Sequence, residues 1–421
     1  MNKDREIHIL GAGVAGLRCA SLLQDEGFEV VVHERSSSVG GRMKTDEVDG
    51  FLLDHGFHVM QTGYPTSAAV IDFDALGAKA FSPGARILRA AGSEARLTTY
   101  ADPFRDPLAS LGALKHERWS DLLKVAKLRL STLFKWPHRS FEGGDGTTQD
   151  FLTGRGAQLS PEFVDRFFRP LFAGIFLESE LRTSERMFRF IFGSMSRGEM
   201  VLPERGIRSY PESLAEKIGW DRIQLSSEAH AESPTSLRVN GELLEVGQVI
   251  LAYPEQEPGE ERSVWTVHMR AQASPAPGGY LILNGDYSFG SSLIAHVAVP
   301  SDVQPSYSPG AEALVTATIV GDAADALGLD EASQIESRAR EELRSWFPAS
   351  ADWSTLDVQE IRRALPERGP GSGLSFNGEA QESGLIRCGD QQVHGSIEGA
   401  LRSAANAACL AVQRLRESEA K

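Results

Sequence analysis

The chain has 421 residues, of which 41% are hydrophobic and 24% are charged, and its formal net charge is −15. This length favours two domains over a single core, the composition is that of a globular protein, and the negative charge argues against a general nucleic-acid-binding protein. The three cysteines, Cys19, Cys388 and Cys409, lie too far apart in sequence to suggest a disulfide pattern or a metal site, so we expect a reducing cytoplasm.

The first predicted elements are a strand over 7–10, a glycine-rich turn, a helix and a second strand over 29–33. The turn has the pattern G-x-G-x-x-G, in which Gly11 permits the sharp bend, Gly13 leaves room for a pyrophosphate and Gly16 lets the helix lie close to the sheet. A glycine-rich turn can also be purely structural. Its position between a strand and a helix favours a dinucleotide-binding site.

Two further features complete this motif. The helix N-terminus, at Val14 and Ala15, offers free N–H groups and a partial positive charge to phosphate groups. Glu34 lies 18 positions after Gly16, near the spacing at which an acidic side chain accepts hydrogen bonds from an adenosine ribose. The motif alone does not distinguish NAD from FAD.

A second glycine pair follows, in the run from Glu34 and Arg35 to Gly40, Gly41 and Arg42, whose planar guanidinium suits two phosphate oxygens. With this run the chain resembles the flavin-dependent amine oxidoreductase superfamily, which includes amine oxidases, protoporphyrinogen oxidases and phytoene-desaturase-like enzymes. The resemblance implies that FAD is bound and that Arg42 contacts its pyrophosphate region. It also implies that a segment after a strand over 50–53 passes close to the flavin ring: Gly56, Phe57 and His58.

The pattern changes after about residue 68. Residues 75–78 predict the end of a helix, and residues 86–89 and 95–98 predict the two strands of a hairpin. We expect the chain to leave the nucleotide-binding domain here.

Residues 106–139 predict about two amphipathic helices, because apolar residues recur there at helix-like spacings. No segment of the chain reaches the ~20 apolar residues of a membrane span. A basic amphipathic stretch can nevertheless lie on anionic lipid, so a peripheral membrane contact is one interpretation. A solvated helix face is the more common one. The basic residues of this stretch are Lys115, Arg118, Lys124, Lys127, Arg129, Lys135 and Arg139.

The segment 163–192 is rich in phenylalanine, and most of these side chains are expected in the core. In the superfamily a similar helical segment borders the substrate cavity. Pro170, Gly174, Ile175 and Ser184 fit its outline loosely. A minority of the phenylalanines facing the flavin could form an apolar wall.

Further along, a helix over 210–218 and strands over 223–225 and 249–252 resemble the superfamily's return to its FAD-binding domain. In that arrangement a backbone group at Ala229 meets the adenine. Beyond it we predict a largely antiparallel layer of strands with one helix. Its elements cover residues 264–270, 280–283, 293–299, 313–319 and, as the helix, 331–346.

A last motif lies near the C-terminus, where a strand over 385–388 ends at Gly389 and Asp390 and a helix opens at Ser396 and Ile397. In the superfamily this pair lies at the far side of FAD. The acidic residue accepts hydrogen bonds from the ribityl chain, and the helix N-terminus stabilises the negative charge of reduced flavin. An NAD-only dehydrogenase has no use for such a motif, so FAD is favoured. No cysteine lies in the setting that holds flavin covalently in some amine oxidases, so noncovalent FAD is expected.

The expected fold is therefore α/β, with a discontinuous Rossmann-type FAD-binding domain (1–75, 203–262 and 370–421), an α+β substrate-binding domain (76–202 and 263–369) and a helical subdomain. The expected activity is removal of a hydride from a C–H bond of a small, apolar or amine substrate, with dioxygen or a quinone reoxidising the flavin. No catalytic residue is assigned, because His58 is more often structural in such a position. The alternatives are a non-redox flavoenzyme like the sugar-nucleotide mutases and a flavin-free binding protein like the Rab-binding dissociation inhibitors.

Overall fold

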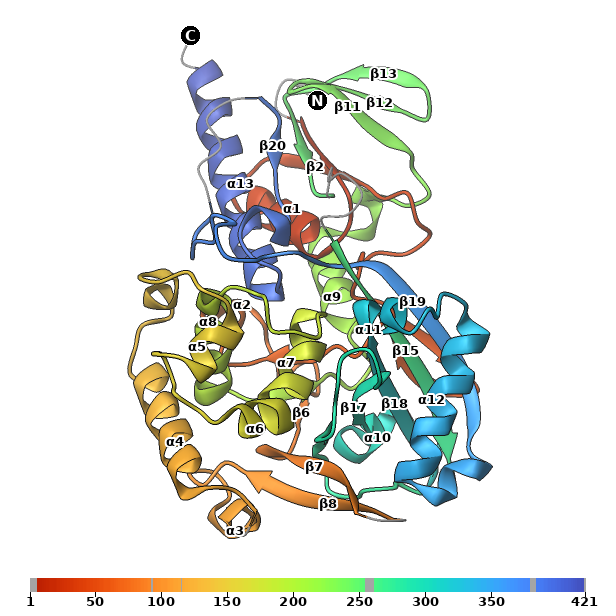
Figure 1. The fold of residues 1–421 in the computed structure, drawn as a ribbon. Helices are drawn as coiled ribbons and strands as arrows, with labels where there is room; N and C mark the ends of the chain where they lie inside the picture. Colours follow the sequence, from red (N-terminus) through yellow and green to blue (C-terminus); the bar gives the residue numbers. More distant parts are fainter. Residues whose placement is uncertain (1–5, 92–93, 115, 254–260, 379–383, 420–421) are drawn as a thin grey trace.

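The computed structural model describes residues 6–91, 94–114, 116–253, 261–378 and 384–419. Its upper part in Figure 1 is built on a parallel sheet in the order β10-β2-β1-β14-β20. The apolar character of the central strands suits a sheet that is covered on both faces. The strands are β1 (Glu6–Leu10), β2 (Glu29–His33), β10 (Ile223–Gln224), β14 (Gln248–Leu251) and β20 (Ile386–Arg387).

Helices cover one face of this sheet and a small antiparallel sheet covers the other. α1 packs against α13 and α9, and the three helices share a core with the sheet. On the opposite face Leu237 packs with Leu10, Val249 and Leu251. The covering elements are α1 (Val14–Asp25), α9 (Ser209–Ile218), α13 (Ile397–Glu419), β11 (Ala229–Ser233), β12 (Ser236–Val239) and β13 (Glu242–Glu245).

A larger sheet in the lower part has the order β19-β15-β18-β17-β16-β7-β8. All neighbouring strands are antiparallel except β16 and β7, which confirms the predicted, largely antiparallel layer. α12 (Ala332–Trp346) packs on it. The strands are β7 (Gly84–Ala91), β8 (Glu94–Ala101), β15 (Glu261–Ala271), β16 (Leu281–Asn284), β17 (Ile294–Ala298), β18 (Ala313–Val320) and β19 (Ser354–Pro366).

A helical layer lies beside this sheet and contains the aromatic segment. Phe168, Phe172 and Phe188 are fully buried there and contact one another, which confirms the core assignment. The two helices predicted within 106–139 are α3 and α4. The layer comprises α3 (Pro107–Leu114), α4 (Trp119–Leu133), η2 (Pro137–Phe141), α5 (Thr148–Thr153), α6 (Pro161–Phe163), η3 (Val164–Phe168), α7 (Arg169–Phe176) and α8 (Glu185–Arg197).

The predicted helix end at 75–78 is wrong. The helix of this region, α2, covers Pro65–Val70, and residues 73–77 form a separate turn. The Asp72 carboxylate accepts a hydrogen bond from the Ala75 N–H at 2.9 Å, and Gly77 adopts a left-handed φ of 59°. The hydrogen bond of the Asp72 side chain to the backbone thus favours a turn over a helix at this point.

The remaining short elements are β3 (Thr45–Val48), β4 (Phe51–Asp54), β5 (Met60–Gln61), β6 (Lys79–Ala80), β9 (Met200–Leu202), η4 (Trp220–Arg222), α10 (Pro300–Val303), η5 (Pro305–Tyr307), α11 (Gly321–Ala326), η6 (Pro348–Asp352) and η7 (Asp390–Gln392). Within the described residues, no helix has the length and apolar character needed to cross a membrane. The domain limits given above remain a prediction.

Stability is expected to fall as the pH falls from 6.5 towards 4. Burial lowers the pKa of six histidines from 6.5, to about 4 for five of them and to about 3 for the sixth. In this window the unfolded chain binds protons that the folded chain excludes, so each group adds a slope of up to ~1.4 kcal/mol per pH unit. The six residues are His8, His33, His58, His268, His296 and His394.

Thermal unfolding followed by circular dichroism at several pH values measures this slope. The variant His268→Gln removes one buried group and should flatten the dependence, whatever its effect at pH 7.5. The variant His230→Gln alters an exposed histidine of β11 and should leave the slope unchanged. A Tm that is constant between pH 7 and 5 would contradict the expectation.

Candidate functional site

The glycine-rich turn joins β1 to α1 as predicted. Gly11 has a φ of 113°, and its N–H donates to the His33 carbonyl at 2.7 Å. A Cβ on Gly16 would lie 2.0 Å from the Gly11 carbonyl oxygen and 2.9 Å from the Ala252 Cβ. Glycine is therefore needed at position 16 for α1 to lie so close to the turn.

Gly13 differs from its neighbours because a Cβ there would meet nothing within 4 Å. It precedes α1, whose first turn contains Val14 and Ala15 and has no side-chain cap. Open space in front of uncapped helical N–H groups is what an anionic group requires. The first turn of α1 therefore fits a phosphate.

The second glycine pair lies against this turn. The Gly40 N–H donates to the Ala12 carbonyl at 2.8 Å, and Gly13 and Gly40 form an isolated parallel bridge. A Cβ on Gly41 would lie 3.3 Å from the Gly13 Cα. The structure thus brings both glycine motifs to one place.

Glu34 is buried at the end of β2, and its carboxylate accepts hydrogen bonds from the N–H groups of Ala12 and Ser36, both at 2.9 Å. It also accepts one from the Ser36 hydroxyl at 2.8 Å, which leaves about one of the four lone-pair sites of a carboxylate for a further bond. Arg35 beside it is exposed. The Glu34 carbonyl accepts a hydrogen bond from the Ser227 N–H at 2.9 Å, which places the start of β11, at Ala229, two residues from this contact.

Arg42 and Asp390 form an ion pair that joins the two ends of the chain. The Asp390 side chain is 5% exposed and that of Arg42 is 39% exposed. The carboxylate charge raises the pKa of the guanidinium. A second Arg42 nitrogen donates to the Ala364 carbonyl at 2.9 Å. Two motifs that are 348 positions apart in sequence therefore meet directly.

Asp390 follows Gly389, whose φ of 136° is unusual for other residues and whose N–H donates to the Ser403 hydroxyl of α13 at 2.9 Å. Ser396 caps α13, because its hydroxyl accepts a hydrogen bond from the Gly399 N–H at 3.0 Å, and Ile397 is the first helical residue. The N-terminus of α13 and the ion pair are thus held by one short segment.

Glu398 and His394 hold this helix start in place, and the sequence did not single out either of them. The buried Glu398 carboxylate accepts hydrogen bonds from the N–H groups of Thr66 and Ser67, and it pairs with Arg402 at 2.8 Å. His394 contacts the Ser396 hydroxyl at 2.9 Å and is fully buried. The contacts of Glu398 with Thr66 and Ser67 join segments that are more than 330 positions apart, so no local pattern reveals them.

Gly56, Phe57 and His58 follow β4 directly. Gly56 adopts a φ of 78°. The Phe57 ring packs edge-on against Phe81 and His296. Burial lowers the pKa of His58 to about 4, with a smaller effect of the positive charge on Arg42. His58 is therefore a neutral imidazole at pH 7, and it lies close enough to Arg42 to experience its charge.

In the segment expected to border a substrate cavity, one residue lines a cavity and the others have structural contacts. Ile175 lines a small cavity of about 10 Å³ together with Gly395 and Arg368, between α7, α8 and the end of β19. This volume holds about one water molecule. Gly174 instead packs inward, since a Cβ there would lie 1.9 Å from the His296 ring. Ser184 caps α8 through the Arg186 N–H at 3.1 Å, and Pro170 is buried at the start of α7.

Two of the cysteines are buried in the core beside this site, and Cys388 directly precedes Gly389. Cys19 and Cys388 are fully buried in the core of the parallel sheet, and their mutual hydrogen bond raises the pKa of Cys19. Cys409 is exposed on α13. It lies twelve residues into that helix, about 18 Å from its first residue.

The comparisons with known proteins agree with this geometry. A family model for flavin-containing amine oxidoreductases matches residues 14–257 and 260–412. An oxidoreductase from Methanosarcina mazei shares the fold with a TM-score of 0.72 at 17% identity, over 95% of this chain and 99% of that one. Cyclohexylamine oxidase from Brevibacterium oxydans IH-35A has a TM-score of 0.70 at 15% identity, over 98% and 99%.

A curated relative matches over a short stretch. The 4,4'-diapophytoene desaturase (4,4'-diaponeurosporene-forming) of Staphylococcus aureus strain Newman is 43% identical over 51 residues, which are 12% of this chain and 10% of that protein. The family model, in contrast, covers most of the chain, and the solved structures confirm the expected fold class. The chain belongs to the flavin-containing amine oxidoreductase family.

Proposed function

We propose that the protein binds FAD noncovalently across the Arg42–Asp390 ion pair. This pair carries the proposal, because it joins the glycine-rich N-terminal turn to the start of the C-terminal helix. The turn offers an open, uncapped helix N-terminus at Gly13, Val14 and Ala15. An elongated dinucleotide can then bind to the N-terminal turn at one end and to the start of the C-terminal helix at the other.

Each of the remaining residues has a place in this arrangement. Glu34 accepts a hydrogen bond from the adenosine ribose, and Arg35 and the Ala229 backbone lie on the adenine side. Arg42, whose side chain is 39% exposed, binds the pyrophosphate, and Asp390 accepts hydrogen bonds from the ribityl chain. The N-terminus of α13, at Ser396 and Ile397, stabilises negative charge on the flavin ring. The other contacts of the site come from Gly11, Gly16, Gly40, Gly41, Gly56, Phe57, His58 and Gly389.

We propose further that the substrate is a small, apolar or amine molecule that loses a hydride from a C–H bond. Bound flavin supplies the hydride acceptor and passes the electrons to dioxygen or a quinone. In this proposal the substrate approaches on the side of the small cavity next to Gly395 and Ile175, which has to widen for a substrate to enter. His58 is neutral at pH 7 and lies outside the lining of this cavity. No residue is assigned as catalytic.

The cofactor is tested first. The purified chain, supplemented with FAD, should be yellow, and acid precipitation should release intact FAD into the supernatant. Flavin that stays with the precipitated protein would contradict noncovalent binding, and release of FMN would contradict the dinucleotide. The buried positions of Cys19 and Cys388 support the noncovalent form.

Anaerobic titration with candidate substrates tests the reaction. We expect a primary amine or an apolar compound with an activated C–H bond to bleach the flavin absorbance near ~450 nm, and admission of oxygen or a quinone to restore it. Photochemically reduced enzyme, mixed with the same acceptors, provides the control for reoxidation. If the flavin binds but no compound of either class bleaches it, the hydride transfer is contradicted and a non-redox flavoenzyme becomes the better hypothesis.

A further inference from the structure

The outward face of α4 is apolar. Trp119, Leu123, Leu130 and, directly after the helix, Phe134 are exposed, and their spacings of four, seven and four residues place them on one helix face. A helix that covers a core normally turns its polar face to water. Here the inward face includes two polar residues. The buried residues of α4 are Asp121, Leu128 and Thr132.

This apolar face belongs to a larger cluster. Ten large hydrophobic side chains are exposed in the part of the chain that the structure describes, and seven of them lie within residues 104–136. Single exposed apolar residues are normal, whereas a contiguous group marks an interaction surface. Trp136, which is 68% exposed, follows the end of α4, so that a tryptophan lies at each end of the apolar face. Tryptophan is enriched where an apolar phase meets water.

A basic cavity opens beside the same helix. It has a volume of about 340 Å³, lies between α4, α5 and α8, and has no carboxylate among its lining residues. The whole chain has a net charge of −15, so the positive charge of this cavity is opposite in sign to that of the molecule. Its cationic lining residues are Lys124, Lys127, Lys135, Arg139, Arg155 and Arg189.

Most of these cations are free to bind an anion. Lys124 lies 3.8 Å from Asp121, and Arg189 lies 3.4 Å from Glu185. The other four cations of the cavity make no ion pair with any residue that the structure describes. Lys127 belongs to both surfaces, since it lines the cavity and stands between Leu123 and Leu130 on α4.

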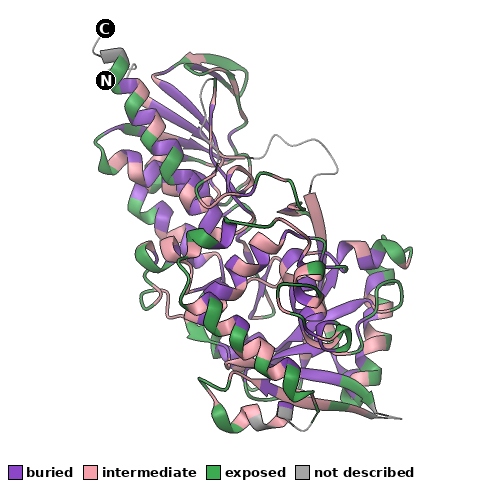
Figure 2. Cartoon of the chain, turned by 60° about the vertical axis from the view of Figure 1, so that its left-hand side comes forward, coloured by how far each residue is buried: buried purple, intermediate pink, exposed green. Residues whose placement is uncertain are grey.

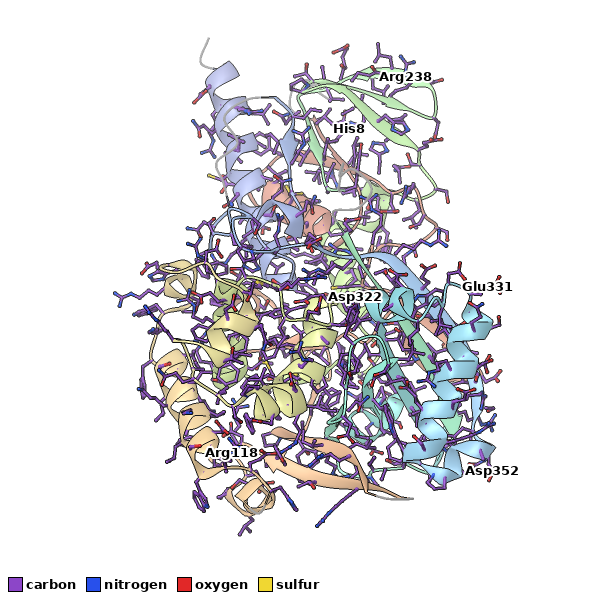
Figure 3. The ribbon with its side chains drawn as sticks, in the orientation of Figure 1. His8, Arg118, Arg238, Asp322, Glu331 and Asp352 are labelled. Atoms are coloured by element: carbon purple, nitrogen blue, oxygen red, sulfur yellow. The ribbon has the colours of Figure 1, made fainter. Side chains whose placement is uncertain are left out.

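We propose that α4 and its basic cavity dock on an anionic phospholipid bilayer. The apolar face enters the boundary between headgroups and acyl chains, and the cavity receives the phosphate of one lipid headgroup. Figure 1 shows α4 at the edge of the molecule, and Figure 2, which brings that side forward, shows much of it exposed. In Figure 3, Arg118 at the start of α4 lies at the opposite end from His8 of the parallel sheet, so docking leaves the proposed dinucleotide site uncovered.

The charge of the surface favours lipid over a second copy of the chain. A symmetric dimer through α4 would bring two clusters of cations together about the twofold axis. Like charges placed opposite each other disfavour such a contact. An anionic bilayer complements both parts of the surface at once.

Vesicle co-sedimentation of the full chain, loaded with FAD, tests the proposal. We expect binding to phosphatidylcholine vesicles that contain about 30 mol % phosphatidylglycerol, little binding to phosphatidylcholine alone, and weaker binding as salt is raised. A chain that stays in the supernatant with anionic vesicles overturns the proposal. Equal binding to neutral vesicles overturns the role of the cavity.

Two pairs of substitutions separate the parts of the surface. Leu123→Ser with Phe134→Ser, and Lys135→Glu with Arg139→Glu, should each weaken binding to anionic vesicles at least about tenfold. Trp220→Ser with Leu243→Ser alters exposed apolar residues elsewhere and should bind like the parent. Wild-type binding by either α4 pair overturns the proposal.

Size-exclusion chromatography without lipid gives the rival outcome. If the parent chain is a dimer that Leu123→Ser with Phe134→Ser dissociates, and neither binds vesicles, the face is an interface between copies. Flavin content and Tm are measured for every variant, so that loss of folding is recognised directly. The proposal does not depend on the proposed reaction.

Discussion

The variant Gly13→Ala should fold normally and bind FAD at least about tenfold more weakly than the parent. A Cβ at this position meets nothing within 4 Å, and the backbone at Gly13, with φ −73° and ψ 173°, is accessible to alanine. The fold should lose no more than ~1 kcal/mol, the order of cost of a poorer residue before a helix. If the pyrophosphate lies against this backbone, the new methyl group occupies its place, and the affinity for FAD should fall at least about tenfold, or ~1.4 kcal/mol.

Gly16→Ala is the matched comparison. Its Cβ would lie 2.0 Å from a backbone oxygen of Gly11, so the clash exists without any cofactor. Overpacking of this kind costs about 1 to 3 kcal/mol, and it should lower the Tm of the apoprotein. Thermal unfolding of the apoprotein and FAD titration by flavin fluorescence measure the two effects separately. Wild-type FAD affinity in Gly13→Ala would show that no cofactor approaches the turn there.

The variant Asp390→Ala should weaken FAD binding by about ten- to a hundredfold. Hydrogen bonds to a charged group contribute about 1.5 to 3 kcal/mol each, and the buried Asp390 carboxylate is expected both to accept them from the cofactor and to orient Arg42. Without it the guanidinium of Arg42, which is partly exposed, can turn into solvent. Isothermal titration of the apoprotein with FAD measures the loss.

Two further variants distinguish charge from shape. Asp390→Asn keeps the size of the side chain but removes its charge, so it should bind FAD with an affinity between those of the parent and of Asp390→Ala. Asp25→Ala breaks an exposed ion pair with Lys217 at the far end of α1 and should leave FAD affinity unchanged. If Asp390→Ala binds FAD like the parent, the Arg42–Asp390 pair is a structural contact only.

Much of the local structure could be predicted from the sequence. The strand at Glu29–His33 was predicted with its observed bounds, and the helix over 331–346 differs from α12 by one residue at its start. Such elements follow from apolar periodicity and from glycines whose steric effect acts within a few residues. The edge strand β19 was missed. Its sequence shows little alternation of apolar and polar residues, and it includes charged residues that face solvent at the edge of the sheet. The strand is stabilised by its pairing with β15, which its composition does not indicate.

The sequence alone predicted the strand, the glycine turn and the helix at the N-terminus, and it predicted one dinucleotide site for the motifs at the two ends of the chain. Only the tertiary structure decided that Arg42 pairs with Asp390, that Glu398 holds the start of α13 against α2, and that the apolar face of α4 points outward. The reason is physical. Backbone sterics and periodicity act between neighbours in sequence, whereas the partner of a side chain depends on the packing of segments that lie far apart in the chain, as Arg42 and Asp390 do.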